Sequence, residues 1–261
     1  MTGFLQFPWR ALRSAATLFA ILCTATPALA QTEVDLQLIF AVDASGSVNQ
    51  YRFELQKRGY VAALRNPKVL AAILGGRTQS IAVCLFQWTG PFLQAPVLPW
   101  MLLKNEASIE SAASQIESTP RKLFSGGTSI SGAIDYSMGL FAQSPFKGER
   151  RVIDISGDGS NNGGRSVVRA RDEAVAKDVT INGLPILAVE PYLDQYYRDY
   201  VIGGPGAFMI VATSFEDFSD AILKKMIVEI ASNDPMAPSA RQPIGRQPAL
   251  PDSLMRERRG S

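Results

Sequence analysis

The feature that most constrains the fold is an alternation of continuous apolar runs with amphipathic runs, which lasts for about 200 residues. Apolar runs such as 36–42 are typical of parallel strands that are buried on both faces. Amphipathic runs such as 47–64 carry apolar residues at helical spacing. The alternation predicts an α/β fold, with a doubly wound, mostly parallel six-stranded sheet and helices on both of its faces.

The predicted elements follow from these runs and from the turn residues between them. Thr89-Gly90-Pro91 separates two strand patterns and predicts an antiparallel hairpin, while Pro96 and Pro99 place its second strand at an edge of the sheet. Pro67 ends the first helix, for which Ser47 is a plausible N-cap. We expect strands at 36–42, 79–88, 93–103, 151–155, 179–189 and 207–211, and helices at 47–64, 105–118, 129–141, 165–177, 191–200 and 215–231.

The amino-terminal residues 1–30 have the composition of a cleavable signal peptide. Arg10 and Arg13 precede an apolar run at 15–23, and Ala28-Leu29-Ala30 ends the segment with small residues. We therefore expect cleavage after Ala30 and export to the periplasm or the medium. An uncleaved anchor is the alternative, but the run is shorter than the ~20 residues that span a bilayer. No later segment is long enough to span one either.

The carboxyl-terminal residues 233–261 differ in composition from the expected domain at 31–232. They hold five arginines, several prolines and few apolar clusters, which predicts a disordered tail. An extended docking segment is the alternative interpretation. Removing the tail and the leader leaves 19 basic and 21 acidic side chains for residues 31–230. This balance excludes the basic footprint of a nucleic-acid-binding domain.

Two residue types limit the chemistry that this chain can perform. It has no histidine, which excludes Ser-His-Asp and Cys-His catalysis and a zinc site with histidine ligands. Cys23 leaves with the leader, so Cys84 is the one cysteine expected in the mature chain. It lies in an apolar strand pattern, where a packed thiol is the expected state and no intrachain disulfide can form.

Three short motifs place oxygen-bearing side chains at the ends of predicted elements. Asp43-Ala44-Ser45-Gly46-Ser47 ends the first strand, Gly126-Gly127-Thr128 precedes a helix, and Ser156-Gly157-Asp158 follows a later strand. Each motif alone has an ordinary interpretation as a helix cap, a loop or a turn. Because loops at the carboxyl ends of parallel strands converge, the three motifs together predict one cation site.

The order and spacing of these motifs resemble the metal-ion-dependent adhesion site of von Willebrand factor A (vWA) domains, written D-x-S-x-S, then T, then D. The resemblance covers about residues 34–232. Within the vWA superfamily, the chain is similar to a group of exported bacterial proteins with no assigned function. It implies metal ligation by Asp43, Ser45, Ser47, Thr128 and Asp158, directly or through water. It also implies an open coordination position for a partner's carboxylate, and a last helix that shifts when the site is occupied.

The expected function is a metal-dependent protein-interaction module that acts outside the cytoplasm and is not an enzyme. Oxygen ligands favour Mg²⁺, with Mn²⁺ or Ca²⁺ as alternatives, and the expected partner is a protein that supplies an acidic residue. A structural subunit of an envelope assembly with a vestigial site is the second hypothesis. A Mg²⁺-dependent phosphoester hydrolase is the third, although Ser45 stands where such an enzyme usually has a second acid.

Some residues keep open interpretations. Asp154 is an acid inside an apolar strand pattern, and its partner is not specified by the sequence. Asn161 and Asn162 either orient the metal site from a second layer or belong to a plain glycine-rich loop. Aromatic residues near the site are expected to pack in the core rather than to line a binding surface; these are Trp88, Trp100, Tyr192, Tyr196, Tyr197 and Tyr200.

Overall fold

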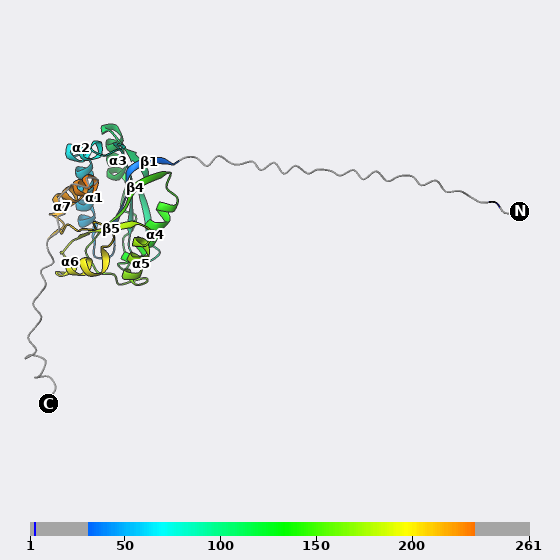
Figure 1. The fold of residues 1–261 in the computed structure, drawn as a ribbon. Helices are drawn as coiled ribbons and strands as arrows, with labels where there is room; N and C mark the ends of the chain where they lie inside the picture. The colour runs from blue at the N-terminus through cyan, green and yellow to red at the C-terminus, as the bar shows by residue number, and fades with distance from the viewer. Residues whose placement is uncertain (1–2, 4–30, 233–261) are drawn as a thin grey trace, which may run out of the picture. The chain divides into compact units, whose positions relative to one another are not determined.

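The computed structural model of this chain describes residue 3 and residues 31–232. The expected signal peptide and the expected tail lie outside the described residues. Figure 1 shows a central sheet with α1, α2 and α7 on one side and α4 and α5 on the other. Within the described part of the chain, no helix is both long enough and apolar enough to cross a membrane.

The sheet has five strands rather than the predicted six. They are β1 (Thr32–Asp43), β2 (Ile81–Trp88), β3 (Gln94–Leu103), β4 (Phe146–Gly157) and β5 (Val179–Pro185). Their order is β3-β2-β1-β4-β5, and all neighbours are parallel except β2 and β3. The predicted antiparallel edge strand is therefore confirmed as β3.

The predicted sixth strand at 207–211 is wrong. This segment runs beside β5 and makes only isolated parallel bridges, Gly183 with Met209 and Ile186 with Ala212. The ladder is interrupted on both sides of Gly183, because the backbone N–H of Phe208 donates to the side chain of Asn182 at 3.0 Å and because Pro185 has no N–H to donate. A polar side chain thus replaces a backbone partner, an exchange that hydrophobic pattern does not indicate.

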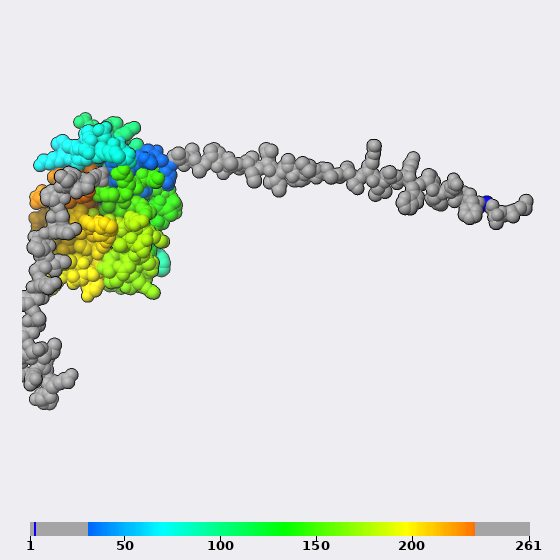
Figure 2. Space-filling model, in the orientation of Figure 1, coloured from blue at the N-terminus to red at the C-terminus, as the bar shows by residue number. Residues whose placement is uncertain are grey.

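Helices cover both faces of the sheet, as predicted. The helices are α1 (Gln50–Leu64), α2 (Pro67–Leu74), α3 (Glu106–Ser118), α4 (Ile130–Ala142), α5 (Val167–Val175), α6 (Leu193–Tyr196), the π-helical turn η1 (Tyr197–Val201) and α7 (Phe218–Ala231). The predicted helix at 191–200 is thus divided between α6 and η1. In the space-filling view, the yellow-green surface of α5 borders the yellow surface of η1 (Figure 2).

Alternate residues of β1 face two separate cores. Leu38 and Phe40 pack with residues of α1, α2, α3 and α7, whereas Ile39 and Ala41 pack with residues of α4, α5 and η1. Side chains point to opposite faces along a strand, so a strand buried on both sides is apolar along most of its length, as β1 is from Leu38 to Val42. Cys84 on β2 is buried in the second core, as its apolar surroundings predicted.

Candidate metal centre

The two acids of the predicted site end neighbouring parallel strands. Asp43 is the last residue of β1, and Asp158 follows Gly157, the last residue of β4. The register pairs Val42 with Ser156, so both acids emerge at the same edge of the sheet. Parallel pairing therefore joins two residues that are far apart in the sequence.

Hydroxyl groups connect the first loop to Asp158. The Ser45 amide donates to Asp43 Oδ1 at 2.7 Å, and the Oγ atoms of Ser45 and Ser47 lie 3.2 Å apart. Ser47 Oγ donates to Asp158 Oδ1 at 2.6 Å. Four of the five predicted ligands are therefore in one hydrogen-bonded group, although they come from two different loops.

The fifth predicted ligand, Thr128, is brought to the same place by backbone contacts between loops. The amide of Gly46 donates to the Gly126 carbonyl at 3.2 Å, and Thr128 exchanges two 2.8 Å hydrogen bonds with Asn162. A methyl group added at Gly159 would lie 3.4 Å from Thr128 Oγ1. The threonine hydroxyl therefore lies beside the residue that follows Asp158.

The ordinary interpretations as helix caps do not hold for Ser47 and Thr128. The side chain of Asn49, not Ser47, caps α1 by accepting from the amide of Arg52 at 2.9 Å. Ser129, not Thr128, caps α4. The expectation that Ser47 is an N-cap is therefore wrong, and both hydroxyls point to the site instead of satisfying a helix end.

Glycines are required where the loops approach each other most closely. Gly126 has a φ of +118°, and a Cβ there would lie 2.8 Å from Thr89 Oγ1. A Cβ on Gly157 would lie 2.9 Å from Asp43 Oδ2 and 3.1 Å from the hydroxyl of Tyr197. Both positions exclude larger residues by contact, and Gly126 also by its backbone conformation.

The electrostatics of the site favour a cation. Asp43 is fully buried, and burial followed by repulsion from Asp158 raises its pKa to about 7. Burial also raises the pKa of Asp158, whereas the hydrogen bond from Ser47 lowers it. One oxygen of each carboxylate, Oδ2 of Asp43 and Oδ2 of Asp158, is buried without a hydrogen-bond partner. Two unpartnered acidic oxygens beside three hydroxyls fit a hard divalent cation.

This donor set differs from clusters built on histidine, cysteine or several acids. Within residues 31–232, no three or more His, Cys, Asp or Glu side chains are grouped to hold a metal ion. The predicted site has only two such side chains, the carboxylates of Asp43 and Asp158, because Ser and Thr hydroxyls supply its other three oxygens. A hydroxyl-rich set is typical of hard cations that retain water.

Three charged residues near the site were missed by sequence reasoning. Arg52 in the first turn of α1 donates to the Ser47 carbonyl at 2.8 Å, and its Nη1 lies 3.6 Å from Asp158 Oδ2. Arg121 donates to the Ala44 carbonyl at 3.1 Å. Glu190 accepts from the Ser160 amide at 3.0 Å. The spacing from Ser47 to Arg52 was the only available signal, because the other two come from distant loops.

The open interpretation of the asparagines is now decided by contacts. Asn162 positions Thr128 as described, and Asn161 Oδ1 accepts from the Ser131 amide at 3.0 Å. Both side chains therefore connect the loop after β4 to the start of α4. They act on the arrangement of the loops and not on the carboxylates directly.

Comparison with models of protein families assigns the chain to a family. Residues 33–234 match the family model described as "Protein of unknown function (DUF1194)". The chain belongs to the DUF1194 family. A search of the curated proteins gives no match. The family assignment therefore defines a relationship and leaves the activity to be argued from the site.

Solved structures show that this DUF1194 chain has a vWA-like fold. Proximal thread matrix protein 1 (PTMP1) from the mussel byssus has a TM-score of 0.55 at 17% identity, covering 77% of this chain and 49% of that protein. A von Willebrand factor type A protein from Catenulispora acidiphila scores 0.53 at 15% identity, covering 76% and 43%. The pilus adhesin SpaC from Lactobacillus rhamnosus GG scores 0.53 at 14% identity, covering 77% and 31%.

The DUF1194 chain spans about half the length of the mussel protein, or less in the other two cases. Another structure of PTMP1 is described as having a "zinc occupied MIDAS motif". At these identities the likeness concerns the fold. The expected vWA architecture is thus confirmed, with five strands in its sheet.

Proposed function

We propose that this chain is a divalent-cation-dependent protein-interaction module. Asp43, Ser45, Ser47, Thr128 and Asp158 hold the ion, and Mg²⁺ is its first candidate, with Mn²⁺ or Ca²⁺ as alternatives. The observation that carries the proposal is the pair of buried carboxylate oxygens without a hydrogen-bond partner, beside three hydroxyls that lie close together. A bound cation would balance this charge and offer a coordination position to an acidic side chain of the partner.

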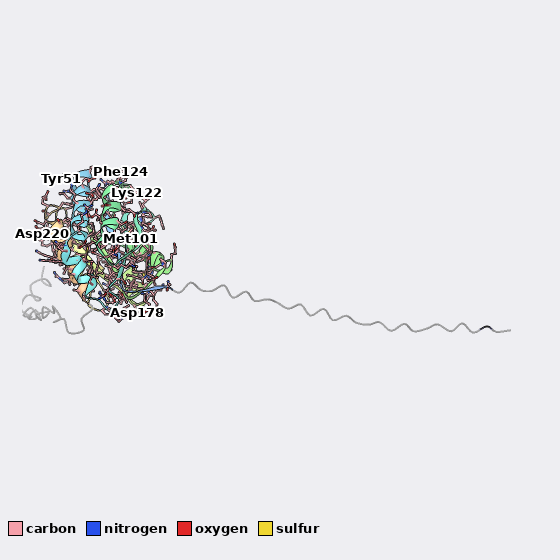
Figure 3. All side chains as sticks on the ribbon, turned by 90° about the horizontal axis from the view of Figure 1, so that it is seen from above. Tyr51, Met101, Lys122, Phe124, Asp178 and Asp220 are labelled. Carbon is pink, nitrogen blue, oxygen red and sulfur yellow. The ribbon has the colours of Figure 1, made fainter. Side chains whose placement is uncertain are left out.

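An apolar rim around the site supports a protein partner. The loops at the carboxyl edge of the sheet, together with the first turn of α1, expose large apolar side chains, namely Tyr51, Phe92, Leu93, Phe124, Val189 and Tyr192. Phe92 is 93% exposed and Tyr192 is 74% exposed, so the expectation that Tyr192 packs in the core is wrong. Tyr51 and Phe124 lie at one end of the molecule in Figure 3, and Asp178, which precedes β5, lies at the other.

Apolar residues that surround a polar centre are a typical arrangement for protein recognition. The ion would supply orientation through one strong contact, and the rim would supply buried area. Nucleic acid is disfavoured by the near balance of charge over residues 31–230. The vWA-like relatives include an adhesin and a thread protein by their titles, which is consistent with this class of function.

The proposal includes the organisation and the location of the chain. Residues 1–30 act as a signal peptide, residues 31–232 form the vWA-like domain, and residues 233–261 form a Pro/Arg-rich tail. The mature protein then acts in the periplasm or outside the cell. In that setting millimolar divalent cations would be available to a weak site, as for other extracellular modules.

One observation favours a different role, in which the site holds no metal. Arg52 lies 3.6 Å from Asp158 and partly balances its charge, as a substitute for a cation would. In that case the chain is a structural subunit of an envelope assembly, and its contacts do not depend on the ion. A hydrolase is not favoured, because Ser45 remains where a second acid would act and its amide is bound to Asp43.

Thermal denaturation with and without Mg²⁺ or Mn²⁺ tests the proposal. We expect either ion to raise the Tm of the wild type and to leave the Tm of Asp43→Ala unchanged, because that variant lacks one of the two acids. Asp199→Ala removes an exposed acid whose side chain makes no hydrogen bond or ion pair among the described residues, and this variant should respond as the wild type does. Equal shifts in the wild type and in Asp43→Ala would contradict the proposal.

Affinity capture with the full chain in Mg²⁺ and in EDTA distinguishes the two roles. The interaction module predicts a partner that is retained in Mg²⁺ and released by EDTA. Retention of the same partner in both buffers would favour the structural subunit.

A further inference from the structure

A second group of polar residues is buried between β4 and α7, away from the metal centre. Asp154 lies on β4, Lys225 and Glu229 lie on α7, and Asn182 lies on β5. The side chains of Asp154 and Lys225 are fully buried, and Glu229 and Asn182 are nearly so. The proposed function uses none of these residues.

The lysine lies between the two carboxyl groups. Lys225 Nζ is 2.7 Å from Asp154 Oδ1, and it also donates to Glu229 Oε1. Asn182 Nδ2 donates to the same Glu229 oxygen at 2.9 Å. The contact with Asp154 is a short ion pair.

If all three side chains are charged, several of their carboxyl oxygens have no hydrogen bond. Two carboxyl groups share one ammonium, and three carboxyl oxygens, both of Asp154 and Oε2 of Glu229, lack hydrogen bonds. Burial, and then repulsion from Glu229, raises the pKa of Asp154 to about 7, so this carboxyl holds a proton readily. Buried charges are normally retained only with complete hydrogen bonding.

Other elements supply further groups around the amine and the two carboxyl groups, among them the guanidinium of Arg150, whose positive charge acts on Glu229. The Phe208 ring centre lies 5.1 Å from Lys225 Nζ, and Tyr60 on α1 bonds to Ser156 at 3.3 Å. Arg150 on β4 donates to the Glu229 backbone carbonyl at 2.8 Å. The amine therefore faces aromatic carbon and two carboxyl groups, with water excluded from all of them.

We propose that Lys225 and Asp154 condense to an intramolecular amide, with Glu229 as the proton-transferring group. This modification would join α7 covalently to β4. It follows from the placement of an amine, an acid and a second carboxylate in contact inside the protein.

The reaction balances without an oxidant or any other reactant. Lys225 transfers a proton to Asp154, which gives a neutral amine and a neutral carboxylic acid. The Nζ lone pair attacks Cγ of Asp154, and Glu229 takes a proton from the nitrogen. Glu229 returns this proton to the departing hydroxyl, which leaves as water. One C–O bond breaks, one C–N bond forms, and Glu229 is regenerated.

Burial reverses the usual preference for the separated ions. In water, an ammonium and a carboxylate are well solvated, and condensation is unfavourable. Inside the protein both charges lose that solvation, and a neutral amide removes the two charges together. Groups held in contact also react with effective concentrations of about 10⁵–10⁸ M.

The linkage would perform the role that a disulfide has in many exported proteins. Among the described residues Cys84 is the one cysteine, and it is buried on β2, so no disulfide fastens α7. An amide between β4 and α7 would hold the last helix against the sheet. It would also prevent the shift of the last helix that the vWA resemblance implies, because Lys225 would be fixed to Asp154 on β4.

Intact mass and peptide mapping of the purified full chain test this inference directly. We expect the wild type to be lighter by one water than the mass calculated for the residues it contains, with or without residues 1–30, and a proteolytic map to contain one branched peptide joining Asp154 to Lys225. A wild type with the full calculated mass would overturn the proposal. A loss of water located at Asp158-Gly159 as a cyclic imide would also overturn it.

Conservative variants separate the reaction from the fold. Lys225→Arg keeps the positive charge but lacks the amine, so its mass should equal the calculated mass. Glu229→Gln keeps the shape and should slow the mass loss by more than tenfold after synthesis, since proton transfer contributes about 10²–10⁴-fold. Lys224→Arg changes an exposed neighbour and should form the branched peptide as the wild type does. A branched peptide in Lys225→Arg would contradict the assignment.

Discussion

Asp43 is the residue on which the metal centre and the stability of the fold make opposite demands. The pKa of Asp43 is about 7 in the folded protein, compared with an ordinary value of 3.8 in the unfolded chain. Between these two values the folded protein keeps a proton that the unfolded chain has released. In the absence of metal, the free energy of unfolding therefore decreases as the pH rises from about 4 to about 7. The penalty is complete above pH 7.

Asp43→Asn should therefore stabilise the metal-free protein. Asn keeps an oxygen for the Ser45 amide and carries no charge, so we expect a gain of about 1 to 4 kcal/mol at pH 8 in EDTA. The gain should be smaller at pH 5, where the wild type is largely protonated at this position. Urea denaturation at both pH values measures it. No gain at pH 8 would mean that the neighbouring arginines already neutralise Asp43.

Arg52 competes with a cation for the charge of Asp158. A unit charge and a divalent charge 5 Å apart repel by about 2 kcal/mol even in water, which corresponds to a tenfold or larger change in affinity. We therefore expect Arg52→Gln to lower the Kd for Mn²⁺ by about tenfold. Isothermal titration of both proteins measures this. Arg58→Gln removes an exposed charge from the same helix and should leave the Kd unchanged.

A higher Kd for Mn²⁺ in Arg52→Gln would indicate a different role for Arg52 at the metal centre. Arg52 also donates to the Ser47 carbonyl and stacks on Phe215, at 5.1 Å from its ring centre. A weaker affinity in the variant would mean that these contacts, and not the repulsion, dominate its effect on the ligands.

At the scale of elements, the loop between α3 and α4 decides whether Thr128 reaches the other ligands. We expect Gly126→Ala to weaken Mn²⁺ binding, because the added methyl would contact Thr89 and the residue has a positive φ. The fold should remain, with a loss of stability of about 1 to 3 kcal/mol. Titration and thermal denaturation measure the two effects.

Gly139 offers a matched control on the helix that follows this loop. An added Cβ there has nothing within 4 Å, so Gly139→Ala should stabilise α4 by about 0.5 to 1 kcal/mol and leave the Kd unchanged. Equal metal affinity in Gly126→Ala and in the wild type would remove Thr128 from the proposed ligand set.

Helices and strands were predicted correctly where one local property of the sequence, such as burial on both faces, decides the structure. β1 is apolar at every position from Leu38 to Val42, because both of its faces are buried there, and the sequence alone indicates this. The cap of α1 was predicted two residues too early, since Ser47 and Asn49 are both good caps and only the contact with Asp158 separates them. The segment at 207–211 failed because Asn182, from another element, takes the place of a backbone carbonyl.

At the scale of the whole molecule, the apolar rim should contribute to partner binding independently of the ion. We expect Phe124→Ser and Tyr192→Ser to reduce capture of the partner in Mg²⁺ by tenfold or more each, as exposed aromatic anchors commonly do. Their Mn²⁺-dependent rise in Tm should equal that of the wild type. Capture yield and thermal denaturation, run together, separate the two contributions.

Leu74→Ser provides the control for the rim. Leu74 is a large exposed apolar residue, 43% exposed, at the end of α2 and outside the rim. It should not change capture. If Leu74→Ser reduces capture as strongly as Phe124→Ser, the partner binds a surface other than the carboxyl edge of the sheet.

The sequence by itself determined the α/β class and the order of most elements, and the resemblance of its three short motifs to those of vWA domains supplied the five candidate ligands. It could do so because burial on both faces, helical periodicity and short turn motifs act over a few residues. The tertiary structure decided what depends on residues far apart in the chain. It brought Arg52 to Asp158, gave Asp154 its partners on α7, and exposed Tyr192. These outcomes depend on which loops and helices meet, and hydrophobic pattern along one chain does not record that.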